Sequence, residues 1–196
     1  MYRRQVALVG ADSSAGIAIL DRLGNLLADR LHAPTQAADV YREILEHDPN
    51  NGRALRTLRE LYAQSGNFDE LEQMFAELGQ WAELVDSLST IADRVDEKDR
   101  RVELLMRAAQ VAAEHFDSKD KIARTFERVL SVDASNLDAA RALIPIYRDV
   151  GKWARLLAIY EIVLDHASTD DERLELIVEI RDLCEAKMQS KAMAFQ

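Results

Sequence analysis

The feature that most constrains the fold is that the chain repeats itself. A segment from Asp48 to about Leu78 reappears at a shift of 85 in residue number, with nearly every marker residue kept in kind. The matched pairs are Asp48/Asp133, Asn51/Asn136, Ala54/Ala139, Leu58/Leu143, Tyr62/Tyr147, Gly66/Gly151, Phe68/Trp153, Leu71/Leu156 and Phe75/Tyr160. Within each copy the apolar residues recur at three- and four-residue steps, which indicates one face of an α-helix. Such self-similarity predicts stacked helical hairpins.

A second internal match has a different shift. The segment that starts at Gly79 and Trp81 reappears at a shift of 72, as Gly151 and Trp153. The two shifts differ by 13, and at that same distance Gly66-Asn67-Phe68 is itself echoed by Gly79-Gln80-Trp81. We therefore predict a repeat unit of about 72 residues, made of four helices, with one short helix duplicated at 79–91. Residues 1–196 are predicted to form a single domain.

The pattern predicts an all-α chain of about ten to eleven helices with no β-strand. The expected ranges are 13–31, 35–47, 51–64, 68–78, 81–94, a helix after 96–99 that ends near 115, 118–131, 136–150, 153–166 and 170–188. Residues 189–196 show no pattern and are expected to fray. The apolar start Val6–Val9 aligns with the helix near 153–166, which suggests a piece of a longer array.

Charge and cysteine content argue against several classes of function. The chain carries 25 Lys and Arg against 35 Asp and Glu, a net charge of -10, which disfavours nucleic acid and anionic membrane surfaces as partners. Cys184 is the single cysteine, so no internal disulfide or thiolate metal site is expected. No apolar run approaches the roughly 18 residues of a membrane span. We expect a cytoplasmic protein without cofactor or metal.

The markers resemble the tetratricopeptide repeat family, in the divergent form found in large bacterial scaffold proteins. Pro49, Leu58, Tyr62 and Phe75 stand at family positions, and Leu143, Tyr147 and Tyr160 match in the later copy. The departures are Arg59 and Ile144 where a small residue follows the Leu, and Leu71 and Leu156 where a small residue is usual. The resemblance implies a right-handed α-solenoid of helical hairpins. It also implies protein–protein interaction rather than catalysis.

No catalytic set emerges from the sequence. The start of the chain up to Gly10 and Gly16 superficially resembles a phosphate-binding loop, but it lacks the Gly-Lys-Ser/Thr ending, and a helix end explains it better. The four histidines are scattered near expected helix ends, without the spacing of a zinc site. Cys184 aligns with Ala112, which predicts a small core residue. We therefore expect no enzyme.

Three further residues attract attention. Trp81 and Trp153 occupy one repeat position and are predicted to fill the seam between hairpins rather than to stack on a ligand. Pro145 falls inside a predicted helix, where it removes a backbone hydrogen bond and predicts a kink near 141–145. That kink is either tolerated or opens a groove for a partner.

Arginine is concentrated on the first helix of the hairpins, helix A. In repeats of the resembled kind, helix A lines the concave surface. The residues expected to face it, together with the adjacent Arg59, are called here the helix-A set: Arg53, Arg56, Arg59, Glu60, Arg141 and Arg148. Arginine forks suit carboxylates, so this set predicts a site for an acidic or extended peptide segment. The alternative is a solvated helix face that carries arginine for its helix propensity.

The sequence favours two functions and leaves a third open. The first is a non-catalytic scaffold whose concave face holds a partner protein within a larger assembly. The second is a structural segment that stacks end to end through exposed terminal helices, either as a homo-oligomer or against further repeats. A regulatory domain fused to an enzyme is a third reading. The arginines favour the first function, and the apolar residues Val6–Val9 favour the second.

Overall fold

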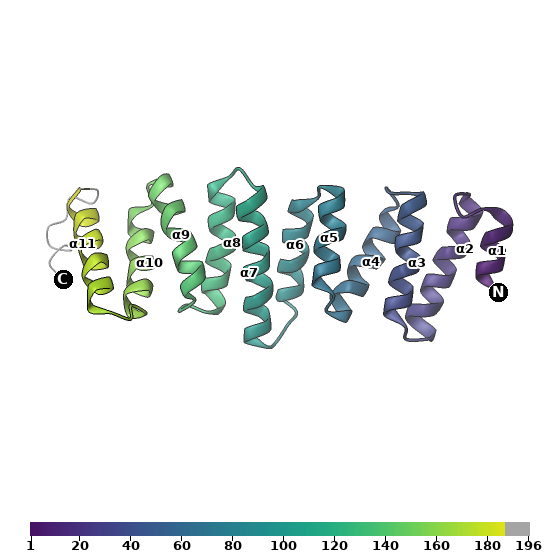
Figure 1. The fold of residues 1–196 in the computed structure, drawn as a ribbon, viewed down its shortest axis with the longest axis horizontal. Coiled ribbons are helices and arrows are strands. Elements are labelled where there is room, and N and C mark those ends of the chain that lie inside the picture. The colour runs from purple at the N-terminus through teal and green to yellow at the C-terminus, as the bar shows by residue number, and fades with distance from the viewer. Residues whose placement is uncertain (187–196) are drawn as a thin grey trace. The chain divides into compact units, whose positions relative to one another are not determined.

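A computed structural model describes residues 1–186, and this part of the chain is helical, with no strand (Figure 1). The residues fall into two compact units, one from Met1 to Gly79 and the other beginning at Gln80. The predicted all-α fold is confirmed. The single domain over 1–196, its four-helix repeat unit and its right-handed course remain predictions, and the tail 189–196 lies outside the described residues.

The first unit consists of five α-helices and one π-helical turn. They are α1 (Tyr2–Val9), α2 (Ser14–Asn25), η1 (Leu26–Arg30), α3 (Pro34–His47), α4 (Gly52–Ser65) and α5 (Phe68–Leu78). Each helix contacts the next along the chain. The helix expected over 13–31 is observed as α2 followed by the π-helical turn η1, so the structure differs from the prediction in the last turn. His32, just after η1, has a φ of 49°.

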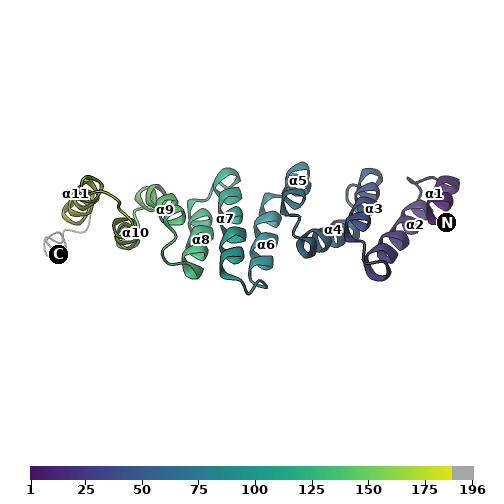
Figure 2. The ribbon, with the colours of Figure 1, turned by 60° about the horizontal axis from the view of Figure 1, so that its bottom comes forward.

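Up to residue 186, the second unit is built in the same way from six helices. They are α6 (Trp81–Ala92), α7 (Lys98–His115), α8 (Lys119–Val132), α9 (Leu137–Val150), α10 (Trp153–Asp165) and α11 (Asp170–Ala186). Within this unit too, each helix lies beside its sequence neighbour (Figure 2). Helix α9 runs unbroken through Pro145, whose side chain is exposed, so the kink near 141–145 stays a prediction.

Helix boundaries recur at the shift of 85 because the same local interactions recur. The Asn51 side-chain oxygen accepts a hydrogen bond from the Ala54 N–H at 3.0 Å, and Asn136 does the same for Ala139 at 3.0 Å. These bonds satisfy N–H groups that the first turn of a helix leaves unpaired. At the other end, Gly66 and Gly151 stop α4 and α9 with φ of 74° and 70°, a left-handed geometry that favours glycine.

The core is a series of apolar layers between neighbouring helices. Leu58 and Tyr62 of α4 are buried in the first unit, and their counterparts Leu143 and Tyr147 are buried in the second. Cys184 is 1% exposed, as expected for a small core residue. These layers hold one side of each helix A and leave the opposite side free to carry polar groups.

Candidate interaction surface

The first-unit members of the helix-A set lie along α4. Arg53 stands in its first turn and is exposed, with its Nε 3.2 Å from an Asp21 carboxylate oxygen of α2. Arg56 and Glu60 are exposed and Arg59 is half-buried, and no ion pair reaches these three within residues 1–186. Arg53 is thus already matched by a carboxylate of its own chain.

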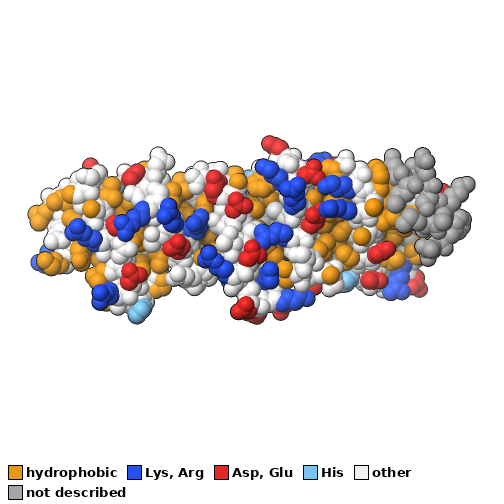
Figure 3. Space-filling model, turned by 180° about the vertical axis from the view of Figure 1, so that it is seen from behind, with side chains coloured by type: hydrophobic (Ala, Val, Ile, Leu, Met, Phe, Trp, Pro, Cys, Tyr) orange, Lys and Arg blue, Asp and Glu red, His pale blue; other side chains and the backbone are white. Residues whose placement is uncertain are grey.

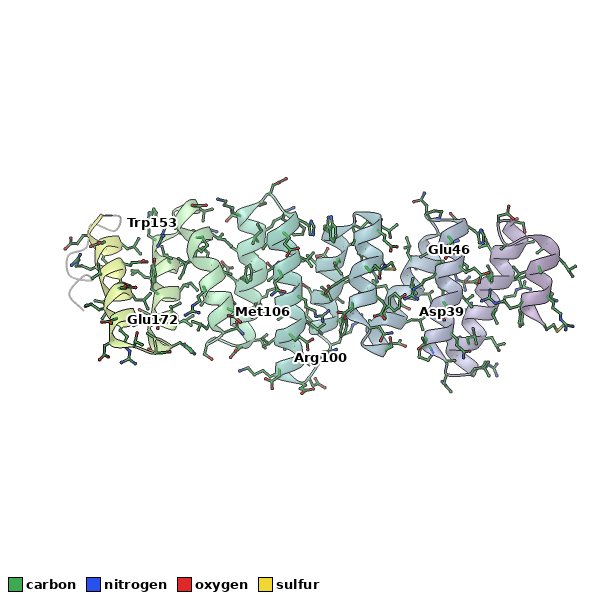
Figure 4. The ribbon with its side chains drawn as sticks, in the orientation of Figure 1. Asp39, Glu46, Arg100, Met106, Trp153 and Glu172 are labelled. Atoms are coloured by element: carbon green, nitrogen blue, oxygen red, sulfur yellow. The ribbon has the colours of Figure 1, made fainter. Side chains whose placement is uncertain are left out.

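The second-unit members form a regular pattern with α11. The Nη2 atom of Arg141 lies 3.4 Å from an oxygen of Glu172, and that of Arg148 lies 3.2 Å from an oxygen of Glu179. Both arginines and both glutamates are seven residues apart, which is two helical turns. Figure 4 shows Glu172 near the end at which α11 begins. Two carboxylates of α11 therefore pair with two arginines of α9 at the same two-turn spacing.

A tyrosine strengthens the second of these pairs. Arg148 donates to the Tyr160 hydroxyl at 2.7 Å, and that hydroxyl donates to Glu179 at 2.6 Å. The hydrogen bond from Arg148 to Tyr160 raises the pKa of the guanidinium above its ordinary value. Burial, then the bond to Glu179, raises the pKa of Tyr160. Arg148 therefore stays charged and Tyr160 stays neutral near neutral pH.

Glu60 belongs to a polar hollow rather than to an arginine row. The hollow has a volume of about 520 Å³ and is lined by residues of η1, the turn that follows it and α4. Its polar lining includes Asp29, His32, Thr57 and Glu60. The first-unit part of the helix-A set therefore mixes both signs of charge. Basic and acidic side chains are also interspersed on the face drawn in Figure 3.

The structure divides the helix-A set between the two units. Arg53, Arg56, Arg59 and Glu60 lie in the first unit, whereas Arg141 and Arg148 lie in the second. Sequence reasoning identified these arginines but missed the carboxylates that face them. The seven-residue spacing of Glu172 and Glu179, equal to that of Arg141 and Arg148, was the available signal.

The two tryptophans are less buried than predicted. Trp81 and Trp153 are half-buried rather than part of the core. The ring of Trp81 stacks on the His115 imidazole, with centroids 3.6 Å apart and planes inclined by 4°. This contact links the start of α6 to the end of α7, because these two neighbouring helices run antiparallel. The tryptophan thus covers a helix end instead of filling an interior seam.

Other chemistry finds little support within residues 1–186. No group of three or more His, Cys, Asp or Glu side chains in this part of the chain could hold a metal ion. His47 and His115 are the last residues of their helices, and the Nδ1–H of His166 donates to the Ile162 carbonyl at 2.8 Å. No described helix is long and apolar enough to cross a membrane.

Comparison with protein families decides the class of repeat. Tetratricopeptide repeat models match residues 30–84, which contain α3 to α5, and residues 146–175, which contain α10. The chain therefore carries tetratricopeptide-like repeats over these two segments. Proteins with these repeats are generally non-catalytic interaction scaffolds. This tetratricopeptide-like protein is accordingly a scaffold for protein–protein interaction.

Solved structures give weaker likenesses to this tetratricopeptide-like protein. The crystal structure of MamA is 17% identical, with 88% of each chain covered and a TM-score of 0.40. YrrB, described as a TPR protein with an unusual peptide-binding site, is 15% identical over 89% of this chain and 96% of its own, with a TM-score of 0.37. TTC0263 of Thermus thermophilus is 18% identical over 86% and 99%, with a TM-score of 0.30. Scores this low place neither a site nor a partner. Among curated proteins no sequence matches.

Proposed function

We propose that this scaffold binds an extended acidic segment of a partner protein along the arginines of its helix-A faces. The supporting observation is the register of Arg141 and Arg148 with Glu172 and Glu179 at 3.4 and 3.2 Å. Side chains that already hold carboxylates two turns apart have the spacing and charge to hold those of a partner. In the first unit, Arg56 is likewise exposed and has no carboxylate of its own among the described residues.

Exchange between internal and external carboxylates is energetically reasonable. Both arginines and both glutamates are at least one-third exposed. Exposed ion pairs contribute about 0–1 kcal/mol each, so a partner carboxylate loses little by displacing Glu172 or Glu179. The internal pairs already restrict the two arginine side chains, which lowers the entropy lost when a segment binds.

The test uses a fluorescein-labelled peptide of alternating glutamate and serine as the probe. Fluorescence anisotropy should show binding that weakens at least tenfold in Arg56→Glu with Arg141→Glu. The control, Arg4→Glu with Arg94→Glu, makes the same charge change at two exposed arginines outside the helix-A set and should retain most of the affinity. Unchanged binding in the first double variant, with native circular dichroism, would exclude the helix-A faces.

Self-assembly is the second candidate, favoured by exposed apolar residues on α11. Leu174 is 61% exposed and Ile177 is 50% exposed, whereas Leu105, which corresponds to Ile177 at the shift of 72, is 2% exposed. A face that is buried in one copy of the repeat and open in another suits contact with a further helix. Light scattering over a concentration series tests this, because stacking predicts mass that grows with concentration and falls back in Leu174→Glu with Ile177→Glu.

A further inference from the structure

A hollow of about 550 Å³ opens in the first unit between α3 and α5, over α4. Its floor is formed by Leu58 and Tyr62 of α4, and its walls include Leu45 of α3 with Met74 and Leu78 of α5. Leu58, Tyr62 and Met74 belong to the core, while Leu45 and Leu78 are partly exposed. The hollow therefore leads from solvent to apolar core side chains, and Arg53, which pairs with Asp21 of α2, is not among its lining residues.

The rim of this hollow is acidic. It carries Glu46, Glu70 and Glu77, against Arg42 as its one cation among the lining residues. Arg42 makes other contacts, with its Nη1 3.3 Å from Asp39 and its guanidinium 5.4 Å from the centre of the Tyr62 ring in the floor. Asp39 and Glu46 both lie on α3 (Figure 4). Within residues 1–186 no ion pair neutralises Glu46 or Glu70.

The equivalent place in the second unit is bridged. At the shift of 85, positions 42, 62 and 70 correspond to Glu127, Tyr147 and Arg155. Arg155 pairs with Glu127, and the Tyr147 hydroxyl donates to the same carboxylate at 2.6 Å. These contacts join α8 to α9 and α10. The polar pair is reversed in the first unit, as Arg42 and Glu70, and there it is not made.

Two further positions near this bridge are polar in the first unit and apolar in the second. Gln73 and Glu77 of α5, joined by a 3.0 Å hydrogen bond, correspond to Ala158 and Ile162 of α10. The second unit therefore has small or apolar side chains at positions where the first-unit hollow has an acidic, polar edge. One repeat position is bridged by its own side chains, and its counterpart is not.

We propose that the first-unit hollow is a binding site for a partner segment that presents an apolar side chain between lysines or arginines. The apolar side chain would cover the floor at Leu58 and Tyr62, a gain proportional to the area removed from water. The cationic neighbours would meet Glu46, Glu70 and Glu77, which Arg42 does not neutralise. This site is distinct from the helix-A faces and takes the opposite charge, so it stands or falls independently of the proposed function.

Three labelled ten-residue peptides serve as probes: leucines flanked by lysines, the same leucines flanked by glutamates, and the lysines with serine in place of leucine. The lysine–leucine peptide should bind at least tenfold more tightly than either of the others, by fluorescence anisotropy. Its binding should shift the backbone amide signals of Leu45, Met74 and Leu78 in a proton–nitrogen correlation spectrum. Absence of binding, equal binding of the three peptides, or shifts confined to other residues would overturn the proposal.

Two variants locate the site. Arg42→Glu with Glu70→Arg gives the first unit the polarity of the second-unit bridge and should reduce affinity at least tenfold. The control Lys119→Asp with Asp149→Lys reverses an exposed ion pair of the second unit and should bind as the parent does. If the first variant fails to fold, Glu46→Lys with Glu70→Lys decides, because it alters only the rim and should reverse the preference towards the glutamate–leucine peptide. Undiminished lysine–leucine binding in the folded variant would refute the site.

Discussion

The ring of Tyr41 lies so close to Gly24 that a β-carbon at position 24 would come within 2.7 Å of it. Tyr41 is fully buried, so its ring cannot move away into solvent. Gly24→Ala should therefore cost about 1–3 kcal/mol of unfolding free energy through overpacking. Gly52→Ala is the matched control, since nothing lies within 4 Å of its β-carbon, and it should be neutral or stabilising by up to about 1 kcal/mol. Urea unfolding followed by circular dichroism compares the two, and equal effects would contradict the contact.

The two asparagine caps should contribute similarly to stability. Asn51→Ala and Asn136→Ala each remove a 3.0 Å bond to a backbone N–H in the first turn of a helix. Each should cost about 1 kcal/mol, and serine should recover most of the loss. Asn50→Ala, one residue before the first cap and exposed, should have almost no effect. A cap variant that matches Asn50→Ala in urea midpoint would show that the bond is not formed in solution.

Tyr147 should make stability fall at alkaline pH. Burial, followed by the hydrogen bond to Glu127, raises the pKa of Tyr147 from its ordinary 10.0 to about 12. A raised pKa means that the folded state holds the proton more tightly than the unfolded state. The stabilisation is thus fully present below about pH 10 and is lost as the pH rises towards about 12. Between pH 8 and pH 12 the melting temperature of Tyr147→Phe should fall less steeply than that of the parent protein. The two are compared as the change from each protein's own melting temperature at pH 8.

Direct titration checks the same assignment. Phenolate absorbance at 295 nm, taken as the difference between parent and Tyr147→Phe, should have its midpoint near pH 12. A midpoint near 10 would mean that Tyr147 is not held by Glu127 in the buried position.

The internal carboxylates should compete with an acidic ligand. If Arg141 and Arg148 bind a partner's carboxylates, Glu172→Gln with Glu179→Gln should raise affinity for the glutamate–serine peptide several-fold. The glutamine side chains keep the size of the glutamates and remove their charge. Glu175→Gln with Glu185→Gln is the control. It makes the same charge change at two exposed residues of α11 that form no ion pair with Arg141 or Arg148. Equal gains in both variants would indicate a general charge effect instead of competition.

Local features of the fold were readable from the sequence. The spacing of Leu58 and Tyr62, the asparagine before α4 and the glycine after it all act within four or five residues. Their effect is therefore the same wherever they recur, and helix positions follow. The π turn at 26–30 was missed because its wider hydrogen bonding has no comparable sequence signal.

The candidate sites were only partly readable. Exposed arginines could be assigned to helix-A faces, but their pairing with Asp21, Glu172 and Glu179 joins residues that lie far apart in the sequence. The half-burial of Trp81 likewise depends on His115 at the far end of another helix. Such contacts depend on which helices become neighbours and on how long side chains settle between them.

The sequence by itself determined the helices, their caps and the repetition that relates them, because each depends on nearby residues along the chain. Tertiary structure decided which of two equivalent repeat positions is bridged. Arg42 and Glu70 stand at the same spacing as Glu127 and Arg155 with the charges exchanged, yet one pair is joined and the other is not. Spacing cannot distinguish them, since Arg42 also contacts Asp39 of its own helix and the Tyr62 ring of α4. The contact with the Tyr62 ring forms only once α3 and α4 have packed.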